Sequence, residues 1–286
     1  SPPYPLHRQA VTPFSGGSDH TILSDPTVGV PTPMLIQWPD RFYHTSEDTL
    51  DKVDPEMLSQ LGCLATAYAY FVAAAGEREG RWLAAQMVAR ARSALARVAQ
   101  DGLTRALELG DPGALPEACR RLERALAFRA ERAQAALETV LRLAPELGPT
   151  VEIGRAAIRR ALEEARVHFR NLGDFGSVEP APDPAEPWGE MGERVFRRLY
   201  RGPLSEQALL ARSNPADRAA LRELERTHAQ TVHTLPLLAA YWMDGRRSLR
   251  EIADLVECEA GLRDVALIVQ WAGIMVRAGF IHQEGW

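Results

Sequence analysis

A stretch near the start of the chain holds side chains that could bind a metal or move a proton. Asp19 and His20 stand together in a Ser-Asp-His triplet, and Tyr43 and His44 begin a Tyr-His-Thr triplet. Asp48 follows shortly afterwards. A neutral imidazole is a common zinc ligand, a carboxylate can fix its tautomer or accept a proton, and a tyrosine hydroxyl can donate to a developing negative charge. These residue types point to metal-assisted hydrolysis, although a lone loop histidine is more often an ordinary surface residue.

The segments around these residues are typical of an α/β fold. Residues 33–38, PMLIQW, form an apolar run bounded by prolines, which favours a buried strand of a parallel sheet. Asp54 before Pro55 predicts a helix start, and the helix should run to Gly76. This helix is apolar on nearly all sides and therefore requires burial on several sides. One strand and one helix are too few to close a core alone.

The order of the motifs supports a more specific interpretation. Ser-Asp-His, then Gly-Val-Pro, then the apolar run, then Tyr-His-Thr and Asp-Thr occur in turn over residues 14–76. This order resembles the closing portion of the co-catalytic zinc aminopeptidases, a di-zinc exopeptidase family that includes bacterial leucyl aminopeptidases. The resemblance implies the last strand and helix of a helix-flanked zinc-exopeptidase sheet, with two zinc ions at the strand ends.

The resemblance also implies roles for individual residues. His44 would be a ligand to one of two zinc ions, and Tyr43 would donate its hydroxyl to the oxyanion of the tetrahedral intermediate. Asp19, His20 and Asp48 would lie in the shell around the metal ligands. The implied reaction is hydrolysis of the N-terminal peptide bond of a peptide substrate.

The chain departs from the family pattern upstream of Ser-Asp-His. The family draws its other metal ligands and its general-base Glu from upstream segments, and here His7 is the one plausible ligand in that part of the sequence. A catalytic zinc needs about three protein ligands. We therefore expect the isolated chain to be inactive, and a missing N-terminal catalytic portion or a partner chain to complete the site.

The rest of the chain is predicted to be mostly α-helical. Residues 77–173 carry three apolar stripes at helical spacing, which predict a helical hairpin or a three-helix layer. Residues 174–190 are rich in Pro and acidic residues and predict an extended linker. Residues 191–286 predict a helical, winged-helix-like module, with a capping box at Ser248 and Glu251 and a final strand. Similar tails occur on some members of the same family.

Charge argues against nucleic acid as the partner of this module. From residue 227 onward the chain has five Arg and seven acidic residues, so it lacks the positive charge that binds phosphates. The whole chain is likewise acidic, with a formal net charge of −5. Two rival hypotheses are a non-catalytic interaction module that keeps the peptidase motif and, less favoured, a winged-helix nucleic-acid regulator.

Composition sets the remaining expectations. The three cysteines form no CxxC pair, which favours neither a disulfide framework nor a cysteine metal site and indicates a reducing, cytoplasmic compartment. No uninterrupted apolar run approaches the roughly 18 residues of a membrane span, so no membrane is expected. The helical extension and tail are compatible with a homo-oligomer.

Overall fold

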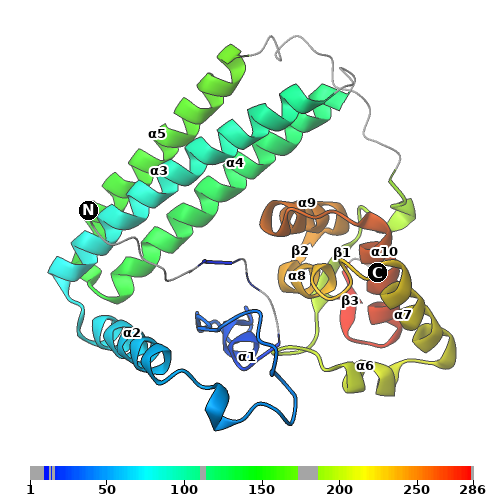
Figure 1. The fold of residues 1–286 in the computed structure, drawn as a ribbon. Coiled ribbons are helices and arrows are strands. Elements are labelled where there is room, and N and C mark those ends of the chain that lie inside the picture. Colours follow the sequence, from blue (N-terminus) through cyan, green and yellow to red (C-terminus); the bar gives the residue numbers. More distant parts are fainter. Residues whose placement is uncertain (1–9, 13, 15–16, 110–113, 173–185, 285–286) are drawn as a thin grey trace. The chain divides into compact units, whose positions relative to one another are not determined.

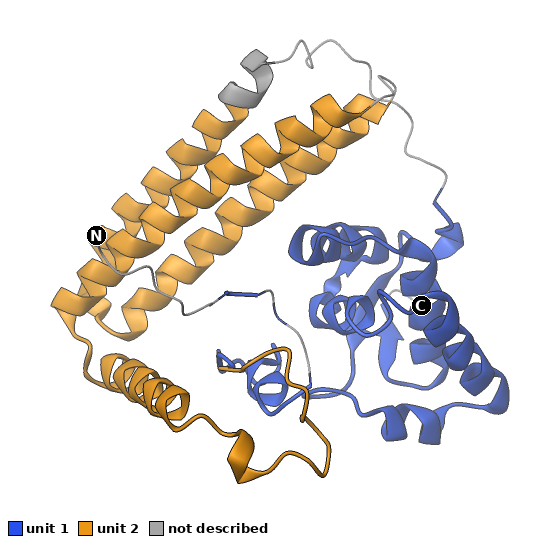
Figure 2. Cartoon of the chain, in the orientation of Figure 1, with its two compact units in different colours: residues 1–34, 184–286 blue, residues 35–183 orange. Residues whose placement is uncertain are grey.

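The computed structural model describes residues 10–12, 14, 17–109, 114–172 and 186–284. These residues are mostly helical, with a small antiparallel sheet in the C-terminal part (Figure 1). The chain divides into two compact units. Residues 1–34 and 184–286 form unit 1, and residues 35–183 form unit 2 (Figure 2).

All regular secondary structure described in unit 2 is helical. Three long helices pack against one another in every pairing, which agrees with the predicted three-helix layer (Figure 1). Their shared core includes Leu95, Leu126 and Ile158, each almost fully buried. The predicted break at 110–113 lies outside the described residues. The elements of unit 2 are η1 (Leu50–Lys52), α2 (Pro55–Ala74), α3 (Glu77–Glu108), α4 (Leu115–Glu138), η3 (Thr139–Arg142), η4 (Pro145–Leu147) and α5 (Gly148–Leu172).

A glycine lets the three long helices approach closely. A Cβ atom on Gly154 of α5 would lie 2.6 Å from Cδ2 of Leu137 in α4 and 3.0 Å from Cγ2 of Val88 in α3. Leu137 is completely buried in the core that the three helices share. The absence of a side chain at residue 154 is therefore a condition of this packing.

Gly154→Val is expected to destabilise the three-helix layer by about 2 kcal/mol, because overpacking a filled core forces side chains and backbone to shift. Chemical denaturation followed by circular dichroism measures this change. Gly148→Ala is the matched control, since a Cβ there meets nothing within 4 Å. Equal stability of the two variants would contradict the close approach at residue 154.

The predicted strand at 33–38 is wrong for the chain as described. These residues have no regular structure, and the side chains of Leu35, Ile36 and Trp38 are between 51% and 66% exposed. The physical reason is that a strand needs a neighbour to satisfy its backbone N–H and C=O groups, and no described strand pairs with this segment.

Helix α2 begins where the sequence predicts, but none of its residues is buried among the described residues. Asp54 accepts hydrogen bonds from the Glu56 and Met57 N–H groups, and Pro55 occupies the first helical position. Within the described chain, α2 is the one helix long and apolar enough to cross a membrane, by length and composition alone.

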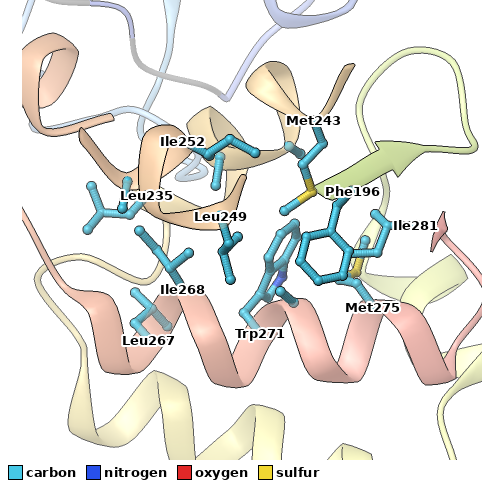
Figure 3. Packing of buried hydrophobic residues seen from close by; sticks show 14 of the residues in the cluster. Phe196, Leu235, Met243, Leu249, Ile252, Leu267, Ile268, Trp271, Met275 and Ile281 are labelled. Atoms are coloured by element: carbon cyan, nitrogen blue, oxygen red, sulfur yellow. The ribbon is translucent and has the colours of Figure 1, made fainter. Parts of the chain in front are cut away.

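Unit 1 surrounds a second core. Phe196 of β1 is fully buried in the core cluster that it shares with residues of α8, α9 and α10, such as Leu249 and Met275 (Figure 3). The sheet order is β2-β1-β3, with both pairings antiparallel. The elements of unit 1 are α1 (His20–Ser24), η6 (Gly189–Met191), β1 (Val195–Arg198), α6 (Glu206–Arg212), α7 (Pro215–Thr227), α8 (Leu235–Trp242), β2 (Asp244–Ser248), α9 (Leu249–Ala260), α10 (Val265–Arg277) and β3 (Ile281–Gln283).

The end of the chain forms the predicted elements. Ser248 and Glu251 make the capping box of α9, and Gly261 ends that helix with φ 71°. Strand β3 lies in the predicted FIHQ segment. Strands β1 and β2 were not predicted, because they are short and rich in charged residues, and they are stabilised by pairing with each other and with β3.

The predicted linker needs a correction at its C-terminal end. Residues 174–185 lie outside the described residues, but Trp188 is buried in the core of unit 1. The Glu186 carboxylate accepts from Arg263 at 2.7 and 2.9 Å. These contacts hold Glu186 and Trp188 in the folded module in spite of the turn-forming composition around them. The module therefore begins within the predicted linker.

Candidate functional site

The Tyr-His-Thr triplet lies in an irregular loop that precedes η1 and α2. The Thr45 N–H donates to the Phe42 carbonyl at 3.0 Å, and the Thr45 hydroxyl donates to the same oxygen at 2.7 Å. This tight turn holds His44 at φ 59°, a left-handed conformation that is uncommon outside glycine. Such a conformation costs about 1–3 kcal/mol, and residues that adopt it cluster at functional sites.

The side chains of the triplet form a small aromatic group. The His44 imidazole stacks on the Tyr43 ring with 3.8 Å between ring centroids, and Trp38 meets Tyr43 edge-on at 5.9 Å. Tyr43 and His44 are both exposed. An imidazole that could bind a metal and a hydroxyl that could donate to an oxyanion therefore stand side by side, open to solvent.

Asp48 lines a shallow hollow of about 390 Å³ in the same loop. Both apolar and charged side chains line the hollow. Its lining comprises Gln37, Pro39, Asp40, Arg41, Phe42, Asp48, Lys52, Val53, Asp54, Met57, Leu58 and Leu61.

Asp19 and His20 belong to unit 1, whereas Tyr43, His44 and Asp48 belong to unit 2. Asp19 is exposed and stands at the N-terminus of α1, with no hydrogen bond from its side chain to the helix. His20 is 8% exposed, and its ring meets Phe14 edge-on at 5.6 Å. Packing therefore accounts for the placement of His20 in unit 1.

A complete catalytic zinc site takes about three protein ligands. No group of three or more His, Cys, Asp or Glu side chains within residues 17–109, 114–172 and 186–284 is placed to hold a metal ion. The exposed His44 imidazole fits the role of a single ligand, and the described residues do not by themselves make up the set.

A buried ion pair in unit 1 was missed by the sequence analysis. Asp25 is completely buried, and Arg198 of β1 donates to both of its carboxylate oxygens, with Nη1 3.0 Å from Oδ2. The side chain of Arg198 is 5% exposed. Thr27 adds two hydrogen bonds to Asp25, from its N–H at 2.9 Å and from its hydroxyl at 2.6 Å.

Aromatic side chains and a turn complete this cluster. The Arg198 guanidinium lies 4.8 Å from the Tyr200 ring centroid and 5.7 Å from that of Tyr241. The Gly202 N–H donates to the Thr27 hydroxyl oxygen at 2.9 Å. Burial, together with the negative charge of Asp25, raises the pKa of Tyr241 to about 12. Six residues from three parts of the sequence thus form one cluster around a desolvated ion pair.

The charge state of Asp25 sets a pH dependence. Burial by itself would raise the pKa of Asp25, but hydrogen bonds from Arg198 and Thr27 outweigh it and hold the pKa below its ordinary value. Because the folded-state pKa is depressed, the stabilisation is present above the unfolded-state pKa of about 3.9 and is lost as pH falls through the folded-state value.

Asp25→Asn is therefore expected to destabilise unit 1 at neutral pH, and its difference from wild type should shrink as the pH falls through the depressed folded-state pKa of Asp25. Urea unfolding of both proteins across pH 2–7, followed by tryptophan fluorescence, measures the difference. A difference that does not change with pH would contradict a charged Asp25 in the folded state.

The sequence carries a weak signal for this cluster. Asp25-Pro26-Thr27 predicts a turn, which the structure confirms through the Asp25–Thr27 hydrogen bonds. The partner, Arg198, lies 173 residues further along the chain, on a strand that was not predicted. No spacing rule reaches across that distance.

Comparison with known proteins adds no relative. No family model, no curated protein and no solved structure matches the chain.

Proposed function

We propose that the chain is the C-terminal part of a zinc-dependent aminopeptidase that hydrolyses N-terminal peptide bonds. The observation that carries the proposal is the pairing of Tyr43 and His44 in a strained, exposed turn just before an apolar helix that the described residues leave uncovered. A remainder of the catalytic α/β domain would supply the other ligands and the general base.

The exposed apolar surface of α2 supports the proposal that a remainder of the α/β domain covers it. Leu58, Leu64, Tyr68, Tyr70 and Val72 are between 48% and 73% exposed. A helix of this composition is stable in water only when its faces are covered, as they are by the sheet of an α/β domain. The exposed apolar run at 33–38 fits the same explanation, because an added neighbouring strand would pair with it.

The proposal gives each residue of the loop a chemical task. The His44 imidazole would bind one metal ion, which supplies the activated water and polarises the scissile carbonyl when bound. Tyr43 would donate its hydroxyl to the oxygen that becomes negative in the tetrahedral intermediate. Asp48, in the hollow of the same loop, would hold a neighbouring polar group or the peptide amine.

Tyr43→Phe is expected to lower kcat about a hundredfold with little change in KM, because the hydroxyl acts only on the transition state. Both constants are measured from the hydrolysis of leucine p-nitroanilide by a longer protein that also contains the upstream sequence, which we call the longer product. Tyr70→Phe, the same replacement within α2 and outside the Tyr43–His44 loop, is the control. A variant with unchanged kcat would remove Tyr43 from the reaction.

The proposal itself is tested by comparing that longer product with the present chain. We expect the longer product to hydrolyse leucine p-nitroanilide and the present chain not to do so. A longer product without hydrolytic activity on peptides of varied N-terminal residue would leave the non-catalytic interaction module as the better hypothesis.

The arrangement of Arg residues in the C-terminal module favours this proposal over a nucleic-acid regulator. Arg247, Arg250, Arg263 and Arg277 each pair with carboxylates of the same unit. Phosphate binding depends on positive charge that is available to the ligand.

A further inference from the structure

The hollow in the Tyr43–His44 loop contains two charged side chains that have no charged partner among the described residues. Neither Arg41 nor Asp48 forms an ion pair or a side-chain hydrogen bond with a described residue, and both are exposed. Charged groups that line a concave surface and are not paired within the protein can pair with a ligand.

The other charged groups of the hollow are already engaged by the protein. Asp40 and Asp54 each accept hydrogen bonds from backbone N–H groups two or three residues further along the chain. Lys52 forms an ion pair with Asp51, which is its neighbour in the sequence. The hollow is therefore left with one cation and one anion for a ligand.

Apolar side chains also line the hollow. Met57, Leu58 and Leu61 come from α2, and Phe42 and Val53 come from the segment before that helix. The volume of about 390 Å³ falls within the range of about 300–1,000 Å³ that is typical of small-molecule sites. An apolar wall together with one unpaired charge of each sign fits a small zwitterion that carries an apolar side chain.

The hollow belongs to the same loop as the imidazole that we assign to the metal. Arg41 precedes His44 by three residues, and three residues span at most about 11 Å. Phe42, which lines the hollow, also accepts the two hydrogen bonds from Thr45 that close the turn at His44. A ligand in the hollow therefore contacts the loop that carries the proposed metal ligand.

We propose that the hollow binds a free dipeptide whose first residue is apolar. Arg41 pairs with the α-carboxylate, since a guanidinium offers two parallel donors to a carboxylate, and Asp48 pairs with the α-amino group. The apolar wall receives the first side chain. In a dipeptide, unlike a longer peptide, the free carboxylate belongs to the residue directly after the cleaved bond. Hydrolysis of this dipeptide rests on the proposed function, whereas its binding does not.

Binding is measured by calorimetry with the 286-residue chain and three ligands, namely Leu-Gly, its C-terminal amide and its N-acetyl form. Each blocked ligand lacks one of the two charges, and we expect Leu-Gly to bind about tenfold more tightly than either. Arg41→Met should remove the preference over the amide, and Asp48→Asn should remove the preference over the N-acetyl form. Arg90→Met is the control, because Arg90 is an exposed arginine of α3 outside the hollow, and it should keep both preferences.

The arginine variants are then made in the longer product. We expect the wild-type longer product to cleave Leu-Gly with a kcat/KM about tenfold above that for the amide, because the carboxylate contact adds binding energy. Arg41→Met should bring this ratio to about one, and Arg90→Met should leave it unchanged.

Each result decides a separate point. Equal binding of the three ligands by the wild-type chain, or binding of none of them, would overturn the zwitterion site, whatever the activity. A preference over the amide that persists in Arg41→Met would overturn the role of Arg41. An active longer product with equal kcat/KM for Leu-Gly and its amide would overturn the dipeptide as the substrate. An inactive wild-type longer product would refute the proposed function, while the calorimetry would still decide whether the hollow binds the zwitterion.

Discussion

Arg198→Met is expected to lower the free energy of unfolding of unit 1 by about 3–5 kcal/mol, because it leaves the carboxylate of Asp25 buried without its charged partner. Asp25→Leu should cost a similar amount, since it leaves the guanidinium unpaired. The side chains of Arg198 and Asp25 are 5% and 0% exposed, so water cannot replace the lost partner in either variant.

The double variant, Asp25→Leu with Arg198→Met, should cost much less than the sum of the two single variants. An apolar pair of similar volume carries no desolvation penalty, and replacements of this kind are often neutral. Urea unfolding of the four proteins gives the double-mutant cycle. Additive costs would show that the two residues act independently and would contradict the paired geometry.

His44→Ala is expected to lower kcat/KM of the longer product on the order of a thousandfold. A catalytic metal contributes several kcal/mol to transition-state stabilisation, and each 1.36 kcal/mol corresponds to about tenfold in rate. Removal of one of about three ligands should release or misplace one of the two ions.

His233→Ala is the matched control for this loss, because His233 is also an exposed loop histidine and lies in unit 1. It should retain wild-type kcat/KM with leucine p-nitroanilide. Retention of full activity by His44→Ala would exclude His44 from the metal site. Equal loss in both variants would point to a general effect on folding.

Local signals in the sequence were sufficient for most helices. Asp54-Pro55 predicts the start of α2, the Ser248–Glu251 capping box predicts the start of α9, and Gly261 predicts its end. These features depend on hydrogen bonds and backbone angles within a few residues, and such short-range physics can be predicted from the sequence. The apolar stripes of α3, α4 and α5 are equally local.

Features that depend on distant partners were not predictable in the same way. Strands β1 and β2 exist because they pair with each other, and their charged sequences give no strand pattern. The Asp25–Arg198 pair depends on the folding of the module. The run at 33–38 shows the converse, since its composition favours a strand but no described neighbour pairs with it.

The same distinction between local and long-range features applies to the candidate site. The turn at Phe42–Thr45 and the stacking of Tyr43 on His44 are local, and the prediction that this loop carries chemistry rests on the residue types alone. The supporting role of Asp19, His20 and Asp48 depends on long-range placement, and it stays a prediction.

The central claim, that His44 is one ligand of a two-zinc site completed by upstream sequence, is tested most directly by zinc content after exhaustive dialysis. We predict about two zinc ions per longer product, about one in its His44→Ala variant, and none retained by the 286-residue chain. A longer product that holds the same amount of zinc with and without His44, or that holds none, would contradict the claim.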